Sequence, residues 1–461
     1  MTNFFTRVLK SIRGGSKSGA EEATARGREA MTRGEMQEAL EHFSAAVDCA
    51  PDNPILIFNR GFAYLEADEL ELAKADFDRV IQMTPDDPDP YFRRGLCHKK
   101  QNNHAAAVKD FSRAIKLQPE KSRLYNFRGL CLRELGEADK AMADFDKALK
   151  VDPDDKSAHV NRALILEDRG QHAEAIKALT RSIETDPNDA DVWNRRGLLY
   201  DELGKYNRAI ADFTEAMRLR PDNAAFYRNR ANSLGETGRI REALADYQKC
   251  LRLAPEMIHA LSGRGWLYVT AKSAEFGLPA FEKGLADFER AAAVDPEYGT
   301  AYGGQSYCLA RLGREREAFQ AAEREIQLSQ ADGIRSRGHV NLILGRYEAG
   351  FADLKEAFRL RPEKAWWANQ IAWMRATLPD PAVRNPAEAL HYAKIACHLT
   401  GNKNWHFVNT MAAALADAGR WDEAIALQEK VVLALGHSNE QQAQLESYRN
   451  RRPTRNNYCD L

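Results

Sequence analysis

A 34-residue repeat is the feature that most constrains what this chain can fold into. Seven prolines and seven alanines each recur at intervals of 34 residues. They are Pro51, Pro85, Pro119, Pro153, Pro187, Pro221 and Pro255, and Ala39, Ala73, Ala107, Ala141, Ala175, Ala209 and Ala243. A period of about 20–50 residues indicates a solenoid, in which each repeat buries its apolar face against the next. A single compact core is therefore not expected.

Two further series complete the repeat. They are a small residue at Gly27, Gly61, Gly95, Gly129, Ala163, Gly197, Ala231 and Gly265, and a bulky one at Phe43, Phe77, Phe111, Phe145, Leu179, Phe213 and Tyr247. The small residue and the alanine let two helix axes approach closely, while the bulky side chain fills the space between pairs. Glycines such as Gly136 and Gly204 permit a tight turn, and the proline ends the second helix. Each repeat is thus predicted to be two antiparallel helices.

This pattern resembles the tetratricopeptide repeat over nearly the whole chain. The resemblance implies an all-α fold, a right-handed superhelical solenoid of about twelve antiparallel helix pairs. It also implies that partners bind along the concave surface, which the first helix of each pair lines. The divergent segment 371–401, with a lengthened turn, is similar to the C-terminal repeats of some large bacterial members of the family and favours a bacterial source.

The repeat becomes irregular after Pro255. The interval from Pro255 to Pro296 is 41 residues, which indicates seven inserted residues around 271–284. The repeat over 299–330 lacks both the aromatic residue and the proline. The expected organisation is a basic tail and linker over 1–19, a solenoid over 20–437 (regular over 20–257, irregular over 258–437), and a capping helix and tail over 438–461.

Composition and motifs argue against several classes of function. The net charge of −1 gives no preference for nucleic acid or an anionic surface. Seven scattered cysteines without a CxxC pair suit reduced thiols in a cytoplasm. No phosphate-binding loop, HExxH, GxSxG or calcium-loop motif occurs, and no apolar run is long enough to span a membrane. We therefore expect no enzyme activity, no metal and no cofactor.

Two charged series accompany the repeats, an arginine before the small residue and, in most of the same repeats, an aspartate before the second-helix aromatic residue. They are Arg26, Arg60, Arg94, Arg128, Arg162, Arg196, Arg230 and Arg264, and Asp76, Asp110, Asp144, Asp212, Asp246 and Asp287. One interpretation is a basic stripe that binds an acidic or phosphorylated partner. The other is an internal ladder in which each arginine bonds an aspartate of the second helix. The parallel course of the two series favours the ladder.

Candidate binding residues follow from the positions that line the concave surface in the family. They are Phe58, Asn59, Phe62, Phe92, Arg93, Asn126, Asn161, Asn194, Arg195, Arg228 and Asn229. Some family members hold a terminal carboxylate with a lysine and asparagine clamp, and only Arg228 with Asn232 approaches that pattern. Others grip a peptide backbone with an asparagine ladder, to which Asn59, Asn161 and Asn229 correspond.

Each of these assignments has a structural alternative. The asparagines that precede Arg-Gly are equally well explained as common repeat residues. Phe58, Phe62 and Phe92 form either an apolar anchor site or part of the core. The tryptophans of the C-terminal repeats are open to the same two interpretations, and core is favoured. They are Trp366, Trp367, Trp373, Trp405 and Trp421.

The N-terminal tail has an amphipathic pattern of its own. On a helix, Phe4, Phe5, Val8, Leu9 and Ile12 would share one face, opposite Arg7, Lys10 and Arg13. Such a segment could contact an anionic membrane weakly, cap the first repeat or be disordered.

The sequence as a whole predicts a non-catalytic scaffold that holds a partner protein or extended peptide in its groove. The alternative is a membrane-peripheral assembly factor located by residues 1–13. Nucleic acid is not expected as a ligand, because the net charge is near zero and acids occur at the ends of the first helices.

Overall fold

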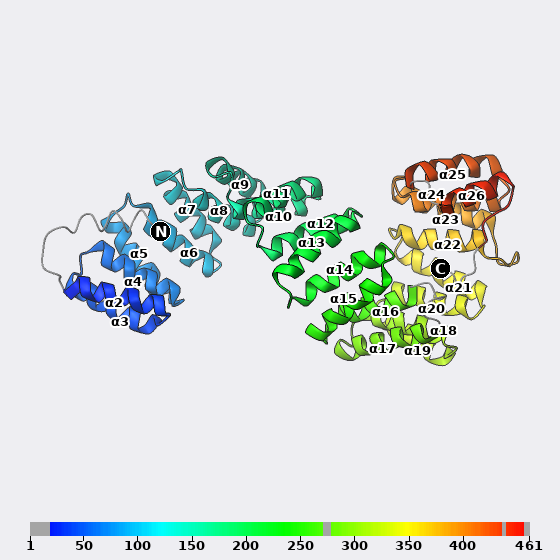
Figure 1. Ribbon diagram of the computed structural model, residues 1–461, viewed down its shortest axis with the longest axis horizontal. Helices are drawn as coiled ribbons and strands as arrows, with labels where there is room; N and C mark the ends of the chain where they lie inside the picture. The colour runs from blue at the N-terminus through cyan, green and yellow to red at the C-terminus, as the bar shows by residue number, and fades with distance from the viewer. Residues whose placement is uncertain (1–18, 271–277, 436–438, 456–461) are drawn as a thin grey trace. The chain divides into compact units, whose positions relative to one another are not determined.

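The computed structural model describes residues 19–270, 278–435 and 439–455. Within these ranges the chain forms 25 helices and no strand, which confirms the all-α prediction. Contacts divide the chain into two compact units, Met1–Leu219 and Arg220–Leu461. In each unit, successive helices pack as antiparallel pairs (Figure 1).

The first unit contains six helix pairs. They are α2 (Gly19–Arg33) with α3 (Met36–Cys49), α4 (Pro54–Glu66) with α5 (Leu70–Met83), α6 (Pro88–Lys100) with α7 (His104–Leu117), α8 (Ser122–Glu134) with α9 (Ala138–Val151), α10 (Lys156–Asp168) with α11 (His172–Thr185), and α12 (Ala190–Glu202) with α13 (Tyr206–Leu219).

The second unit contains six more pairs and a final helix, so the described chain has the twelve pairs that the sequence predicted. They are α14 (Ala224–Glu236) with α15 (Ile240–Leu253), α16 (Ile258–Thr270) with α17 (Leu278–Val294), α18 (Gly299–Arg311) with α19 (Glu315–Leu328), α20 (Gln330–Ile343) with α21 (Tyr347–Leu360), α22 (Ala365–Thr377) with α23 (Pro386–Leu399), and α24 (Trp405–Asp417) with α25 (Trp421–Leu435), followed by α26 (Asn439–Arg449).

The repeat residues have the local roles that their chemistry predicts. Gly204 has a φ of 67° in the turn between α12 and α13, and Asp68 adopts a φ of 64° at the equivalent turn between α4 and α5. Second helices end shortly before their prolines; α5, for example, ends at Met83, two residues before Pro85. A Cβ atom on Gly129 would lie 2.6 Å from the Phe145 ring, so this position has room only for glycine unless the ring moves.

The irregular repeats keep the pair architecture by local adjustments. Residues 271–277 of the expected insertion lie outside the described residues, while 278–284 begin α17, which has 17 residues where α15 has 14. Eight residues, 378–385, join α22 to α23, and this is the lengthened turn expected within 371–401. Buried Arg375 holds this turn, because its Nη1 donates to the carbonyl of Val383 at 2.6 Å.

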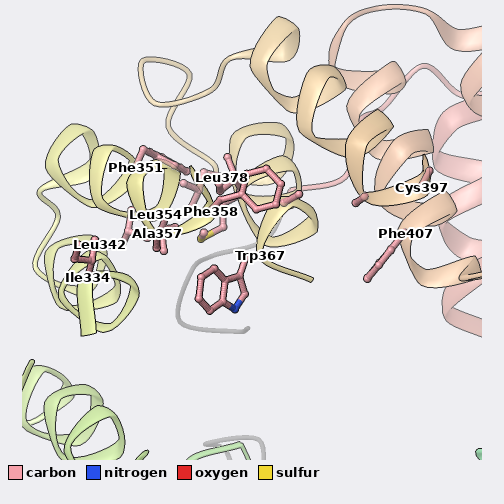
Figure 2. Close-up of a cluster of buried hydrophobic side chains, with 14 of the residues drawn as sticks. Ile334, Leu342, Phe351, Leu354, Ala357, Phe358, Trp367, Leu378, Cys397 and Phe407 are labelled. Carbon is pink, nitrogen blue, oxygen red and sulfur yellow. The ribbon is translucent and has the colours of Figure 1, made fainter. Parts of the chain in front are cut away.

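The largest apolar core of the described residues lies in the second unit, where side chains from α20 to α25 meet (Figure 2). Phe351 and Phe358 of α21 pack in this core with Trp367 of α22 and Phe407 of α24. Trp367 is therefore a core residue, whereas Trp366 beside it is 56% exposed. The tryptophans of this region thus divide between core and surface.

The final helix, α26, lies in the segment for which the sequence predicted a cap; it packs on α25 and buries Tyr448 completely. The basic amphipathic segment 1–13 lies outside the described residues. None of the described helices combines the length and apolar character that crossing a membrane requires.

Glu325 of α19 is an acid in a position that the other repeats fill with small or apolar residues. Its side chain is buried against α18, since a Cβ atom on Gly303 would lie 2.8 Å from both carboxyl oxygens. Burial raises the pKa of Glu325 from its ordinary 4.5 to about 7, although a hydrogen bond with Ser336 and the charge of Arg335 act to lower it. Between these two values the folded chain holds a proton that the unfolded chain has lost, so stability falls as the pH rises through this window.

We expect Glu325→Gln to remove this pH dependence, because an amide is neutral at every pH. At pH 8 the variant should unfold with a free energy about 2 kcal/mol higher than wild type, and at pH 5 the two should be nearly equal. Urea unfolding curves at pH 5, 6, 7 and 8 measure the difference. A difference that stays constant across this range would contradict the assignment of the buried proton to Glu325.

Candidate binding surface on the first helices

The arginine series forms an internal ladder. In each complete rung, the arginine of the first helix makes two hydrogen bonds to one aspartate of the second helix, through Nε and Nη2. The rungs are Arg60–Asp76, Arg94–Asp110, Arg128–Asp144, Arg196–Asp212, Arg230–Asp246 and Arg264–Asp287. The aspartates are at most 6% exposed, so these arginines act within the fold and are not a basic stripe for a partner.

Departures from the ladder follow the sequence. Arg162 has alanine at the partner position, Ala178, and contacts Asp146 of the preceding repeat at 3.0 Å instead. Arg26 also lacks an aspartate and pairs with Glu22 on its own helix. A further rung, Arg337 with Asp353, lies beyond the series identified from the sequence.

The first helices of consecutive repeats contact one another; for example, α4 contacts α6, and α8 contacts α10. Their outward side chains form what we call the first-helix surface, on which the candidate residues fall. Five of these residues are buried and support the surface without being open to a partner. They are Phe58, Asn59, Phe92, Asn126 and Asn229, each at most 7% exposed.

The buried aromatic candidates belong to the core between repeats. The Phe58 ring lies 5.6 Å from that of Phe77, and the Phe92 ring lies 5.8 Å from Phe111 and 5.4 Å from Phe127. Of the two interpretations of Phe58 and Phe92, the structure therefore supports core packing, because their apolar area is already removed from water.

The candidate asparagines are half-buried or buried, and two of them bond each other. Asn161 of α10 donates to Oδ1 of Asn126 in α8 at 2.7 Å. Arg228 donates to Oδ1 of Asn229 at 2.8 Å. Asn194 of α12 is half-buried and also has an interaction partner. The asparagines therefore do not form an open row of carboxamides.

Charged candidates differ in whether their charge is already neutralised. Arg195 of α12 pairs with Glu167 of α10 at 2.8 Å. Arg93 of α6 instead stacks on the Phe62 ring of α4, 4.4 Å from its centroid, and it makes no ion pair with any described residue. Burial lowers the pKa of Arg93 and the nearby charge of Arg123 acts in the same direction, whereas the charges of Asp89 and Glu66 act to raise it. Phe62 and Arg93 thus present a half-buried cation on an aromatic ring.

The sequence did not single out Arg123 of α8, which belongs to the same patch. Its guanidinium lies 4.8 Å from the centroid of Phe92 and 3.6 Å from the carboxylate of Asp89. The patch of Phe62, Arg93 and Arg123 therefore carries two cations, of which Arg123 pairs with Asp89 while Arg93 feels the charges of Asp89 and Glu66 without a direct ion pair. Arg123 stands at the second position of its helix, which varies between repeats, so no periodic signal marks it.

The described residues contain no metal-binding cluster, and the two cysteines of α6 and α8 are not reactive thiols. In the described residues, no three histidine, cysteine, aspartate or glutamate side chains are placed to hold a metal ion. Burial raises the pKa of the Cys97 thiol and the Cys131 thiol to about 11, so neither has the lowered pKa of a reactive cysteine.

Comparisons with known proteins agree with the repeat architecture. Four models described as the tetratricopeptide repeat match the chain, at residues 24–88, 92–155 and 280–333, at 132–199, at 190–223 and at 224–257. No curated protein matches the sequence.

Three solved structures with similar folds are distant from this chain in sequence. A repeat protein from Parabacteroides merdae is 22% identical, with 51% of this chain and 93% of that one aligned at a TM-score of 0.41. The C-terminal part of a repeat protein from Cytophaga hutchinsonii is 20% identical, covering 54% and 98% at a TM-score of 0.46. The protein YrrB, described as having an unusual peptide-binding site, is 22% identical, covering 39% and 93% at a TM-score of 0.33.

Proposed function

This chain belongs to the tetratricopeptide repeat family, and we propose that it is a non-catalytic scaffold that binds a partner protein or extended peptide on its first-helix surface. Repeat proteins of this kind generally serve protein interaction, and their stacked helices offer an extended surface instead of an enclosed pocket. We place the scaffold in the cytoplasm, since none of the six cysteines in the described ranges is bonded to another.

The observation that carries this proposal is the patch of Phe62, Arg93 and Arg123. The ladder arginines are neutralised within the fold, whereas Arg93 is held half-buried over an aromatic ring, where the charges of Asp89 and Glu66 act on it but no described residue forms an ion pair with it. Burying a cation without a directly bonded counter-ion costs free energy, and an incoming carboxylate would recover part of that cost. The patch therefore fits a segment that presents an acidic side chain beside an apolar one.

Neighbouring residues extend the same surface along the first unit. Leu96, Leu130 and Leu164 are half-buried at equivalent positions of α6, α8 and α10, and Leu198 of α12 is 39% exposed. A partner segment that lay along them would bury apolar area in successive repeats. Asn161 and Arg195 flank this row and would contribute hydrogen bonds after rearranging their present partners.

We expect Arg93→Glu to reduce capture of the partner from a native lysate by at least about tenfold, because the reversed charge would repel an acidic segment. Arg181→Glu is the matched control, since Arg181 lies on the second helix α11 with 72% of its side chain exposed. Both variants should unfold like wild type. Cross-linked capture followed by mass spectrometry is the measurement, and equal capture by the two variants would refute the patch as the binding site.

A further inference from the structure

The second unit has a first-helix surface of its own, formed where α20 meets α22. We define the α20–α22 face by Arg335 and His339 of α20 together with Trp366, Asn369, Gln370 and Trp373 of α22. The two helices meet through His339 Nε2 and Gln370 Oε1, which lie 3.2 Å apart. Trp366, Gln370 and Trp373 share one side of α22, because they are three or four residues apart.

Several polar atoms of this face have no hydrogen-bond partner among the described residues. They are the indole N–H of Trp373, the Nε of Arg335 and the Oδ1 of Asn369, all shielded from solvent. Asn369 itself is only 8% exposed, so a ligand reaches these atoms only when the side chains that cover them shift. A buried polar atom left unpaired costs roughly 1–3 kcal/mol, and a ligand with hydrogen-bonding groups would recover part of that cost after such a shift.

The charge of the face is positive. Burial lowers the pKa of His339 to about 3, so this imidazole is neutral. Arg335 makes no ion pair with any described residue, although its charge acts on the buried carboxyl of Glu325, and its guanidinium lies 5.6 Å from the centroid of the Trp367 ring. An acidic and aromatic segment would complement this guanidinium and the exposed indole surface of Trp366 beside it.

The chain itself delivers such a segment to this face. After α26, Thr454 is held by Tyr448 at 3.0 Å, and Arg455 donates to the carbonyl of Ala376 at 3.1 Å and to Asp417 at 2.8 Å. Ala376 belongs to the last turn of α22, three residues beyond Trp373. The chain therefore leaves the described region at the C-terminal end of the α20–α22 face.

We propose that residues 456–461, Asn-Asn-Tyr-Cys-Asp-Leu, lie along the α20–α22 face and occupy it from within the same chain. Six extended residues span about 20 Å, whereas Ala376 and Trp366 are separated by roughly 15 Å along their helix. The segment contains one acid, Asp460, and no base, and Tyr458 supplies an aromatic ring. Attachment at Arg455 also gives it an effective concentration of the order of millimolar, so weak contacts suffice for occupancy.

This arrangement would regulate the scaffold. A partner that uses the α20–α22 face would have to displace residues 456–461, and it would present similar chemistry, namely an acid near an aromatic side chain and free backbone groups. Only this regulatory consequence rests on the proposed function. The position of the segment can be measured without any partner, so the two proposals can fail separately.

Cys459 provides a native probe of that position. With exposed Cys49 changed to serine, Trp366→Cys places a thiol at an exposed site, and mild oxidation should join residues 366 and 459 within one chain. The matched control is Lys394→Cys, exposed on α23, the other helix of the same pair. We expect most of the Trp366→Cys protein, and less than about a tenth of the Lys394→Cys protein, to form the internal disulfide when peptides are identified by mass spectrometry.

Every other outcome overturns the proposal when it is seen with both α22 variants, Trp366→Cys and Gln370→Cys. A disulfide that joins two chains through residues 366 and 459 would assign the face to a second copy. Equal yields at 366 and 394 would show a segment that samples both helices, and no disulfide at either position would leave the face to a different partner. Gln370→Cys, closer to Ala376 on the same side of α22, is a second variant in case removal of the Trp366 indole itself weakens the contact.

Discussion

Replacing Gly333 with alanine is expected to lower the free energy of opening of α19 and α20 by about 3 kcal/mol or more. A Cβ atom at this position would lie 2.2 Å from the backbone nitrogen of Ile326 and 2.5 Å from its Cα. Both atoms belong to the α19 backbone, so no side-chain rotation can relieve the overlap. The two helices would have to separate and give up packing along their length.

The short connection between these helices explains the close approach. Only Ser329 separates α19 from α20, whereas four residues, 84–87, separate α5 from α6. The repeat over 299–330 lacks the proline that ends other second helices, and α20 consequently begins directly after α19. Both the one-residue connection and the close packing of α19 and α20 therefore require a residue without a β-carbon at position 333.

Gly299→Ala provides the control for the effect of glycine itself. A Cβ atom there would have Glu325 Cγ as its nearest neighbour, at 3.8 Å, which is an ordinary contact. Because alanine favours the helix over glycine, this variant should be unchanged or up to about 1 kcal/mol more stable. Native-state amide hydrogen exchange of α19 and α20 measures local opening in a repeat array, which need not unfold as one unit. Comparable opening energies for the two variants would show that the backbones can separate at little cost.

Periodic features were the part of this structure that could be predicted from the sequence. The ladder from Arg60 to Arg264 was predictable because each arginine and its aspartate repeat together, so one physical role explains both series. The rung at Arg337 was missed because the shortened connection at Ser329 shifts it out of the 34-residue interval. The seven inserted residues before Asp287 widen the spacing within a rung from 16 to 23 residues, yet the hydrogen bonds are kept.

The binding surface was less predictable, because its properties depend on pairs of residues from different repeats. The sequence placed Asn126 and Asn161 on one surface, but it did not show that they bond each other across α8 and α10. Likewise, Phe58 and Phe62, one helical turn apart, were open to the same two interpretations from the sequence. Only the packing of α4 against α5 and α6 buries one of them and leaves the other beneath Arg93.

Removing one partner from a ladder rung should have the other large effect on stability. Arg196→Ala is expected to cost about 3–5 kcal/mol in the opening of α12 and α13, since it leaves Asp212, only 4% exposed, as a buried charge without a counter-ion. Arg196 also donates to the hydroxyl of Thr180 in the preceding repeat at 3.0 Å, so the loss extends to that neighbour.

The loss should depend on pH. Burial raises the pKa of Asp212, and the hydrogen bonds and charge of Arg196 act to lower it. Without Arg196 the pKa of Asp212 rises further, and the folded state then holds a proton that the unfolded chain releases above its ordinary value of 3.8. The destabilisation by Arg196→Ala should therefore be smaller at pH 4 than at pH 8.

A double-mutant cycle separates the interaction from the individual side chains. The variant with both Arg196→Ala and Asp212→Ala should lose less than the sum of the two single variants by about 2 kcal/mol or more, because no charge is left buried alone. Arg162→Ala is the control within the same series, since position 178 is alanine and 35% of the Arg162 side chain is exposed. It should cost at most about 1 kcal/mol.

Amide exchange of α10 to α13 in these variants tests the ladder directly. Additive losses at Arg196 and Asp212, or a loss at Arg162 as large as that at Arg196, would mean that the arginines stabilise each pair through their aliphatic stems alone. A coupled and pH-dependent loss confined to the complete rung would instead assign the periodic arginines to the fold. Partner recognition would then depend on arginines outside the ladder, such as Arg93.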